Sequence, residues 1–97
     1  MALIRLALSA PLFALLPESE RAQSAGRTIE LDADSWDDVV TELRRRTPVL
    51  ADKAITDSSA VASGFVLVVN NEVIPNGQTY PVRPGDELAL IAAIAGG

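Results

Sequence analysis

The side chains that perform most chemistry at neutral pH are missing, because the sequence contains no Cys and no His. Thiolate nucleophiles, disulfide bonds, Ser-His and Cys-His arrangements, and zinc or haem sites with sulfur or nitrogen ligands are therefore excluded. General acid–base work at neutral pH would fall to a perturbed carboxylate or to Lys53, the only lysine. The chain is poorly equipped to be an enzyme alone.

Three other groups of residues could carry chemistry, and each also has a plainer structural explanation. Asp52 and Asp57 could pair, but nothing in their spacing distinguishes them from solvated charges. The arginines at 44–46 could bind an anion, but a basic run also matches the dipole at the end of a helix, which we favour. A terminal Gly96-Gly97, taken alone, is more often a frayed end than a functional motif.

Strand patterns occupy five segments of the chain: residues 2–8, 27–31, 65–69, 72–74 and 87–91. Asn70-Asn71 supplies turn residues that tolerate positive φ, and Asn76-Gly77 is a second turn signal. Pro84-Gly85 fits the two central positions of a type II turn. Residues 9–26 are loop-like, with one helical turn around 12–16.

The clearest helix pattern spans residues 35–46. Ser35 is a favourable N-cap, and Asp38 follows three residues later in a pattern that resembles a capping box. One apolar stripe runs along the predicted helix through Trp36, Val39, Val40 and Leu43. Thr47-Pro48 ends it, and a short second helix is predicted over 48–55.

The segment Phe65-Val66-Leu67-Val68-Val69 is apolar on both faces of the predicted strand. Such a strand lies in a sheet covered on both sides, or in a sheet whose second face meets a partner. With one good helix in the chain, only one face is easily covered internally. We therefore expect Phe65, Leu67 and Val69 to bind a partner protein.

The order of elements predicts a single α+β domain, with a mixed sheet packed on one main helix and the first and last strands central. A length of 97 residues is enough for one core and too short for two. The net charge of −5 argues against binding to nucleic acid or to an anionic membrane, and favours a basic protein partner.

The first sixteen or so residues allow a second interpretation. They combine one Arg with an apolar stretch of signal-peptide length, and 22–24 could imitate a cleavage site. Pro11, Pro17 and the polar run 18–21 interrupt that pattern, so we favour a first strand over 2–8.

The end of the sequence resembles a known family. Residues 85–91, Gly-Asp-Glu-Leu-Ala-Leu-Ile, followed by Gly96-Gly97, look like the end of the ubiquitin-like sulfur carriers of the MoaD/ThiS family, and most closely like the small subunit of molybdopterin synthase (MoaD). Val69-Asn70-Asn71 stands where these proteins have a strand ending in Val-Asn. The order of elements matches over nearly the whole chain.

The resemblance implies a β-grasp fold over 1–97 with a flexible C-terminal tail at 92–97. It implies that Gly97 is adenylated with ATP by an activating enzyme similar to MoeB, becomes a thiocarboxylate, and donates sulfur for molybdopterin inside a large subunit similar to MoaE. Gly96 would let the tail enter a narrow channel because it lacks a Cβ. Ile94 and Ala95 would contact the partner. The protein would be cytoplasmic, bind no cofactor or metal, and catalyse nothing alone.

One departure from the family and several alternatives follow from the same residues. Family members commonly carry Pro-Pro where this chain has Ala92-Ala93, so the last strand can run on or the tail can fray. The carrier chemistry could serve another client, in thiamine, cysteine, thiosugar or tRNA thiolation. The chain could instead be a β-grasp binding module with an inert tail, or a secreted structural domain if the signal-peptide interpretation holds.

Overall fold

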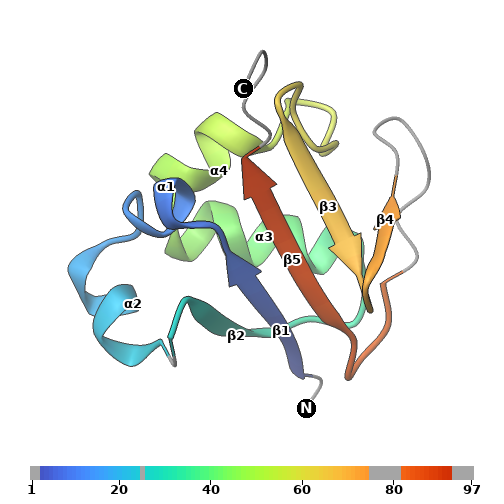
Figure 1. Ribbon diagram of the computed structural model, residues 1–97, viewed down its shortest axis with the longest axis horizontal. Coiled ribbons are helices and arrows are strands. Elements are labelled where there is room, and N and C mark those ends of the chain that lie inside the picture. The colour runs from blue at the N-terminus through green and yellow to red at the C-terminus, as the bar shows by residue number, and fades with distance from the viewer. Residues whose placement is uncertain (1–2, 25, 75–81, 93–97) are drawn as a thin grey trace.

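A mixed sheet of five strands carries helices α3 and α4 on one of its faces (Figure 1). The computed structural model describes residues 3–24, 26–74 and 82–92. The elements in chain order are β1 (Leu3–Leu8), α1 (Ala10–Phe13), α2 (Glu18–Gln23), β2 (Thr28–Asp32), α3 (Trp36–Arg46), α4 (Pro48–Ala54), β3 (Phe65–Val69), β4 (Glu72–Ile74) and β5 (Glu87–Ala92).

The strands lie in the order β2-β1-β5-β3-β4. β1 and β5 are parallel, with Leu6 opposite Leu88, and all other neighbours are antiparallel. The first and last strands are therefore central, as the sequence predicts. Each strand, α3 and α4 also fall within one residue of the predicted limits. In β1, β5 and α3 the apolar period of the sequence is also the period of burial.

The core lies between the sheet and helices α3 and α4. Alternate residues of β1 and β5 are buried, because successive side chains of a strand point to opposite faces. They meet the predicted apolar stripe of α3, in which Trp36 is also buried and donates its indole N–H to the carbonyl of Ser59 at 2.6 Å. The largest fully buried side chains are Ile4, Leu6, Leu12, Leu31, Leu43, Leu50, Leu67 and Leu90.

Helix α3 begins and ends as predicted. The hydroxyl of Ser35 accepts a hydrogen bond from the backbone N–H of Asp38 at 3.3 Å. At the other end, the buried Thr47 donates its hydroxyl to the carbonyl of Leu43 at 2.9 Å. Pro48 then starts α4, where its missing N–H removes no helical hydrogen bond.

The prediction for residues 9–26 is wrong in one respect, because the segment contains two short helices rather than one turn. Pro11 lies in the first turn of α1, and Pro17 is the N-cap of α2. Both positions suit proline, because its fixed φ is compatible with a helix start.

Helix α2 has no buried residue and is held to the fold by an ion pair. Arg46 donates from Nε and Nη2 to the two carboxylate oxygens of Glu20, at 3.2 and 2.5 Å. This hydrogen-bonded pair raises the pKa of Arg46 above its ordinary value, so the guanidinium stays charged. The contact fixes α2 beside the edge strand β2.

The turn before β5 has the predicted geometry. Gly85 has a φ of +88°, and Asp86 donates its N–H to the carbonyl of Arg83 at 3.1 Å. Pro84 and Gly85 thus occupy the central positions of a type II turn. The predicted turn at Asn76-Gly77 lies outside the described residues. No helix in the described ranges has the length and apolar character needed to cross a membrane.

Candidate functional site

The tail predicted to carry the chemistry begins where the described part of the chain ends. Ala92 is the last residue of β5, and Ile94, Ala95, Gly96 and Gly97 lie outside the described residues. The structure therefore describes the strand that leads into the tail and the surface beside it.

Strand β5 is a firm base for that tail because it pairs on both sides. Leu90 lies opposite Leu8 of β1 and opposite Leu67 of β3, and only 1% of Leu90 is exposed. The strand continues to Ala92, which lies opposite Phe65. The interpretation that Ala92 lets the last strand run on is thus correct for that residue.

The expectation that Phe65, Leu67 and Val69 face a partner is wrong for Leu67 and Val69, which are buried, and Phe65 is partly buried. Leu67 is 0% exposed and Val69 is 6% exposed, and Phe65 packs against the same core. The reason is the period of the strand, because these alternate residues share the face that α3 and α4 cover. A strand that is apolar on both faces does not itself reveal which set is inside.

The opposite set forms an apolar surface on the face of the sheet that α3 and α4 do not cover. Val66 lies opposite Ile91, and Val68 lies between Ala89 on β5 and Val73 on β4. Val73 and Ile91 are 61% and 41% exposed. We call these five residues the open-face stripe. The alternation of β5 in the sequence could have predicted part of this stripe, because it separates Ala89 and Ile91 from the buried Leu88 and Leu90.

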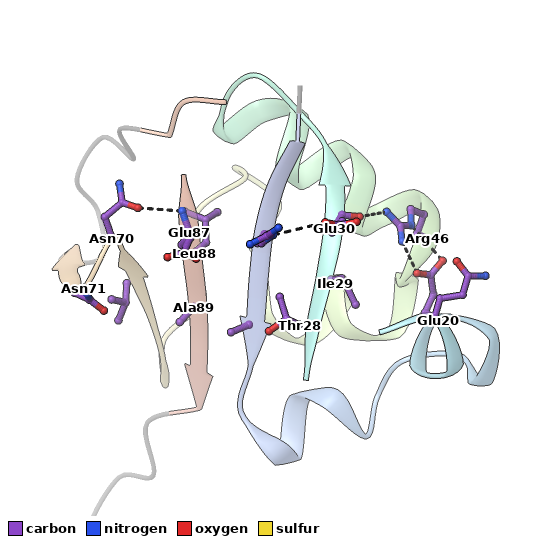
Figure 2. Close-up of a pocket in the computed structure, with 14 residues that line it drawn as sticks. Glu20, Thr28, Ile29, Glu30, Arg46, Asn70, Asn71, Glu87, Leu88 and Ala89 are labelled. Atoms are coloured by element: carbon purple, nitrogen blue, oxygen red, sulfur yellow. Dashed lines mark hydrogen bonds and ion pairs between the residues drawn. The ribbon is translucent and has the colours of Figure 1, made fainter. Parts of the chain in front are cut away.

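A groove of about 800 Å³ crosses this open face and overlaps one side of the stripe (Figure 2). In Figure 2 it extends from Asn70 and Asn71, across β5, β1 and β2, to Arg46 and Glu20. Val68 and Ala89 belong to both the groove and the stripe. The surface is therefore apolar over β3 and β5 and polar toward both ends of the groove.

Charged side chains on β1 and β2 add to this polar part. Arg5 and Glu30 lie opposite each other on the two strands, with Nε and Oε2 3.6 Å apart. Both side chains are more than half exposed, so the pair adds little to stability. It remains available for contacts with another molecule.

Asn70 fixes the end of the groove on β3. Its backbone N–H donates to the carbonyl of Glu87 at 2.8 Å, and its side-chain oxygen accepts from the N–H of Glu87 at 3.0 Å. The residue has a φ of +49° and Asn71 one of +71°, the left-handed region that Asn tolerates best after glycine. The predicted turn therefore also holds the first residue of β5.

The arginines at 44–46 make intramolecular contacts, which supports their structural interpretation. Arg44 donates to the carbonyl of Thr56 at 2.9 Å, and Arg45 pairs with Glu42 at 2.7 Å. Besides binding Glu20, Arg46 donates from Nη1 to the carbonyl of Glu30 at 2.7 Å. All three lie at the C-terminal end of α3, where cations are favourable.

The remaining acidic candidates, Asp52 and Asp57, belong to no metal-binding group in the described part of the chain. Asp52 and Asp57 are both exposed and line a hollow of about 300 Å³ together with Arg44. Within residues 3–24, 26–74 and 82–92, no group of three or more His, Cys, Asp or Glu residues is placed to hold a metal ion.

Three solved structures are similar to this chain over nearly its whole length. The crystal structure of small archaeal modifier protein 1 from H. volcanii has 23% sequence identity and a TM-score of 0.68, and the similarity covers 97% of this chain and 100% of that one. A crystal structure of SAMP1 from Haloferax volcanii has 22% identity and a TM-score of 0.67 (98% and 99% covered). The solution structure of the Haloferax volcanii HVO 2177 protein has 19% identity and a TM-score of 0.66 (99% and 87% covered).

These similarities establish the β-grasp fold of the ubiquitin-like proteins, with its mixed sheet and main helix. No curated protein sequence matches the chain. The profile of the ThiS family matches residues 16–97, which include β2 to β5 and the terminal Gly96-Gly97. The chain therefore belongs to the ThiS family.

Proposed function

We propose that this protein is a sulfur carrier whose terminal carboxyl, on Gly97, is converted to a thiocarboxylate and donates its sulfur in molybdopterin synthesis. The observation that carries the proposal is the family match, which runs through β5 to residue 97. The position of β5 supports it, because a strand paired on both sides gives the tail a fixed point of departure.

The chemistry requires activation from outside the chain. The carboxylate of Gly97 is a poor electrophile at neutral pH, because its unperturbed pKa is about 3.5. In the proposed reaction, a carboxylate oxygen attacks the α-phosphorus of ATP, and pyrophosphate leaves. Hydrosulfide, sulfur at the sulfide oxidation level, then attacks the acyl carbon and displaces AMP, so the thiocarboxylate forms without a change of oxidation state. ATP is thus a substrate of the activating enzyme.

The open-face stripe is the proposed docking surface for the partners. An apolar centre with a polar margin is typical of protein interfaces, and here the margin is the groove with Arg5 and Glu30. Proteins of this family work with activating enzymes. We propose that an activating enzyme resembling MoeB and a synthase large subunit resembling MoaE bind this same surface. The chain is then loaded with sulfur on the first partner and delivers the sulfur on the second, because both cannot be bound at once.

A second candidate function comes from the similar solved structures, two of which are described as small archaeal modifier proteins. In that role an amine of another protein would attack the Gly97 adenylate, form an amide bond and release AMP. The activation is the same, and the acceptor differs.

Reconstitution with a molybdopterin synthase large subunit distinguishes these clients. The loaded chain, mixed with that subunit and the sulfur-free pterin precursor, is expected to yield molybdopterin in proportion to the thiocarboxylate supplied. The matched control is the same chain with an unmodified carboxyl at Gly97. The loaded chain could keep its sulfur in this mixture but transfer it, in a separate assay, to a thiazole or tRNA acceptor. That result would assign another client. Amide-linked conjugates formed without sulfur would assign the modifier role.

A further inference from the structure

Ser9 lies where β1 ends and α1 begins, next to the end of β5. Its backbone N–H donates to the carbonyl of Leu90 at 3.2 Å. This bond continues the parallel ladder between β1 and β5 by one residue beyond Leu8.

The carbonyl of Ser9 does not continue the ladder, because α1 uses it. It accepts from the N–H groups of Leu12 and Phe13 at 3.0 and 2.9 Å. In a regular parallel pair that carbonyl would accept from the residue two positions after Leu90, which is Ala92. The turn into α1 therefore takes away the backbone partner of the last N–H of β5.

The side chain of Ser9 supplies the missing acceptor. Its hydroxyl oxygen accepts from the N–H of Ala92 at 3.1 Å, across 83 positions of the sequence. Ser9 is also the N-cap residue of α1, where a serine hydroxyl usually accepts from an N–H of the first turn, but here it makes no such bond. The hydroxyl binds the end of β5 instead of capping its own helix.

We propose that Ser9 is a positioning residue for the tail chemistry, because its hydroxyl fixes the backbone of Ala92 and with it the direction in which the tail leaves the sheet. The inference rests on the proposed role of Gly97. A tail whose first residues are held reaches its partner from fewer starting conformations. A tail released at Ala92 binds productively only in a fraction of its conformations, so its apparent affinity falls by that fraction.

Replacing Ser9 by Ala tests this directly. Without the acceptor, the amide of Ala92 is expected to exchange with solvent about fivefold faster, the equivalent of ~1 kcal/mol for one neutral hydrogen bond. In the adenylation assay, the KM for the carrier is expected to rise about fivefold, with kcat unchanged, because the substitution alters docking and not the reacting carboxyl.

Three further variants separate positioning from stability. Ser9→Thr keeps a hydroxyl and is expected to retain both the slow exchange and the low KM. Ser35→Ala removes the N-cap of α3, so it lowers stability without changing the local exchange of Ala92 or the KM. Ala92→Pro removes the N–H itself, so Ser9→Ala in that background is expected to raise the KM no further.

The results test two claims separately: that Ser9 positions the tail, and that Gly97 is loaded with sulfur. Faster exchange with an unchanged KM would overturn the inference, as would a KM that rises equally in Ser9→Ala and Ser35→Ala. If the parent chain is never loaded, the proposed function fails. The exchange rate of Ala92 in Ser9→Ala and Ser9→Thr then still decides whether the Ser9 hydroxyl fixes the start of the tail.

Discussion

Replacing Gly96 by Ala is expected to leave the fold unchanged and to slow sulfur loading of Gly97 about a hundredfold. The added methyl group lies in the last peptide units, which in the proposed function enter a narrow channel of the activating enzyme and take dihedral angles that residues with a Cβ avoid. Loading is measured as the fraction of thiocarboxylate over time by intact-mass spectrometry. The melting temperature should equal that of the parent, because β5, the last described strand, ends at Ala92.

Ala93→Ser is the matched control for this variant. It adds one heavy atom to the same tail, further from the reacting carboxyl, and is expected to load at nearly the rate of the parent chain. Normal loading of Gly96→Ala would refute the narrow-channel argument. Equal loss in both variants would show that the tail tolerates no change and that Gly96 has no special role.

Replacing Ile91 by Glu is expected to weaken binding to the activating enzyme about thirtyfold, the equivalent of ~2 kcal/mol at the centre of an interface. Ile91 is 41% exposed on the open-face stripe and lies beside Val66. In the free protein the new carboxylate remains in water, so the fold should persist. In the complex it would be buried among apolar side chains without a partner, which is costly. Calorimetric titration measures the affinity.

Val49→Glu is the control for this second variant. Val49 is 59% exposed on α4, on the face of the sheet opposite the stripe, and the same charge there should leave the affinity unchanged. Parental affinity of Ile91→Glu would place the partner elsewhere on the molecule. An equal loss in both variants would indicate a general effect of added negative charge.

Local patterns were sufficient for most of the fold. The alternation of β1 and β5 and the stripe of α3 predicted these elements because each pattern is also the pattern of burial. The strand Phe65–Val69 was predicted, but the direction of its side chains was not. Val66 and Leu67 are both apolar, so only the pairing with β5 and the position of α3 decide which one faces the core.

Features that depend on distant residues were missed for a different reason. Helix α2 has no buried residue, and its ion pair links Glu20 to Arg46, 26 positions away. The contact between Ser9 and Ala92 spans almost the whole chain and exists only because β1 and β5 are parallel neighbours. The spacing of apolar residues along one segment does not predict contacts between residues that are far apart in the sequence. The terminal Gly96-Gly97, by contrast, was recognised as a motif from the sequence, although those residues lie outside the described structure.

The central claim is that Gly97 carries the sulfur. The most direct measurement is the intact mass of the full chain after incubation with ATP, a sulfur donor and the activating enzyme from the same source. The proposed function predicts a mass increase equal to the exchange of one oxygen for one sulfur, located at Gly97 by fragmentation and lost when Gly97 is removed. An unchanged mass with an activating enzyme that is shown to be active on another carrier would contradict the claim.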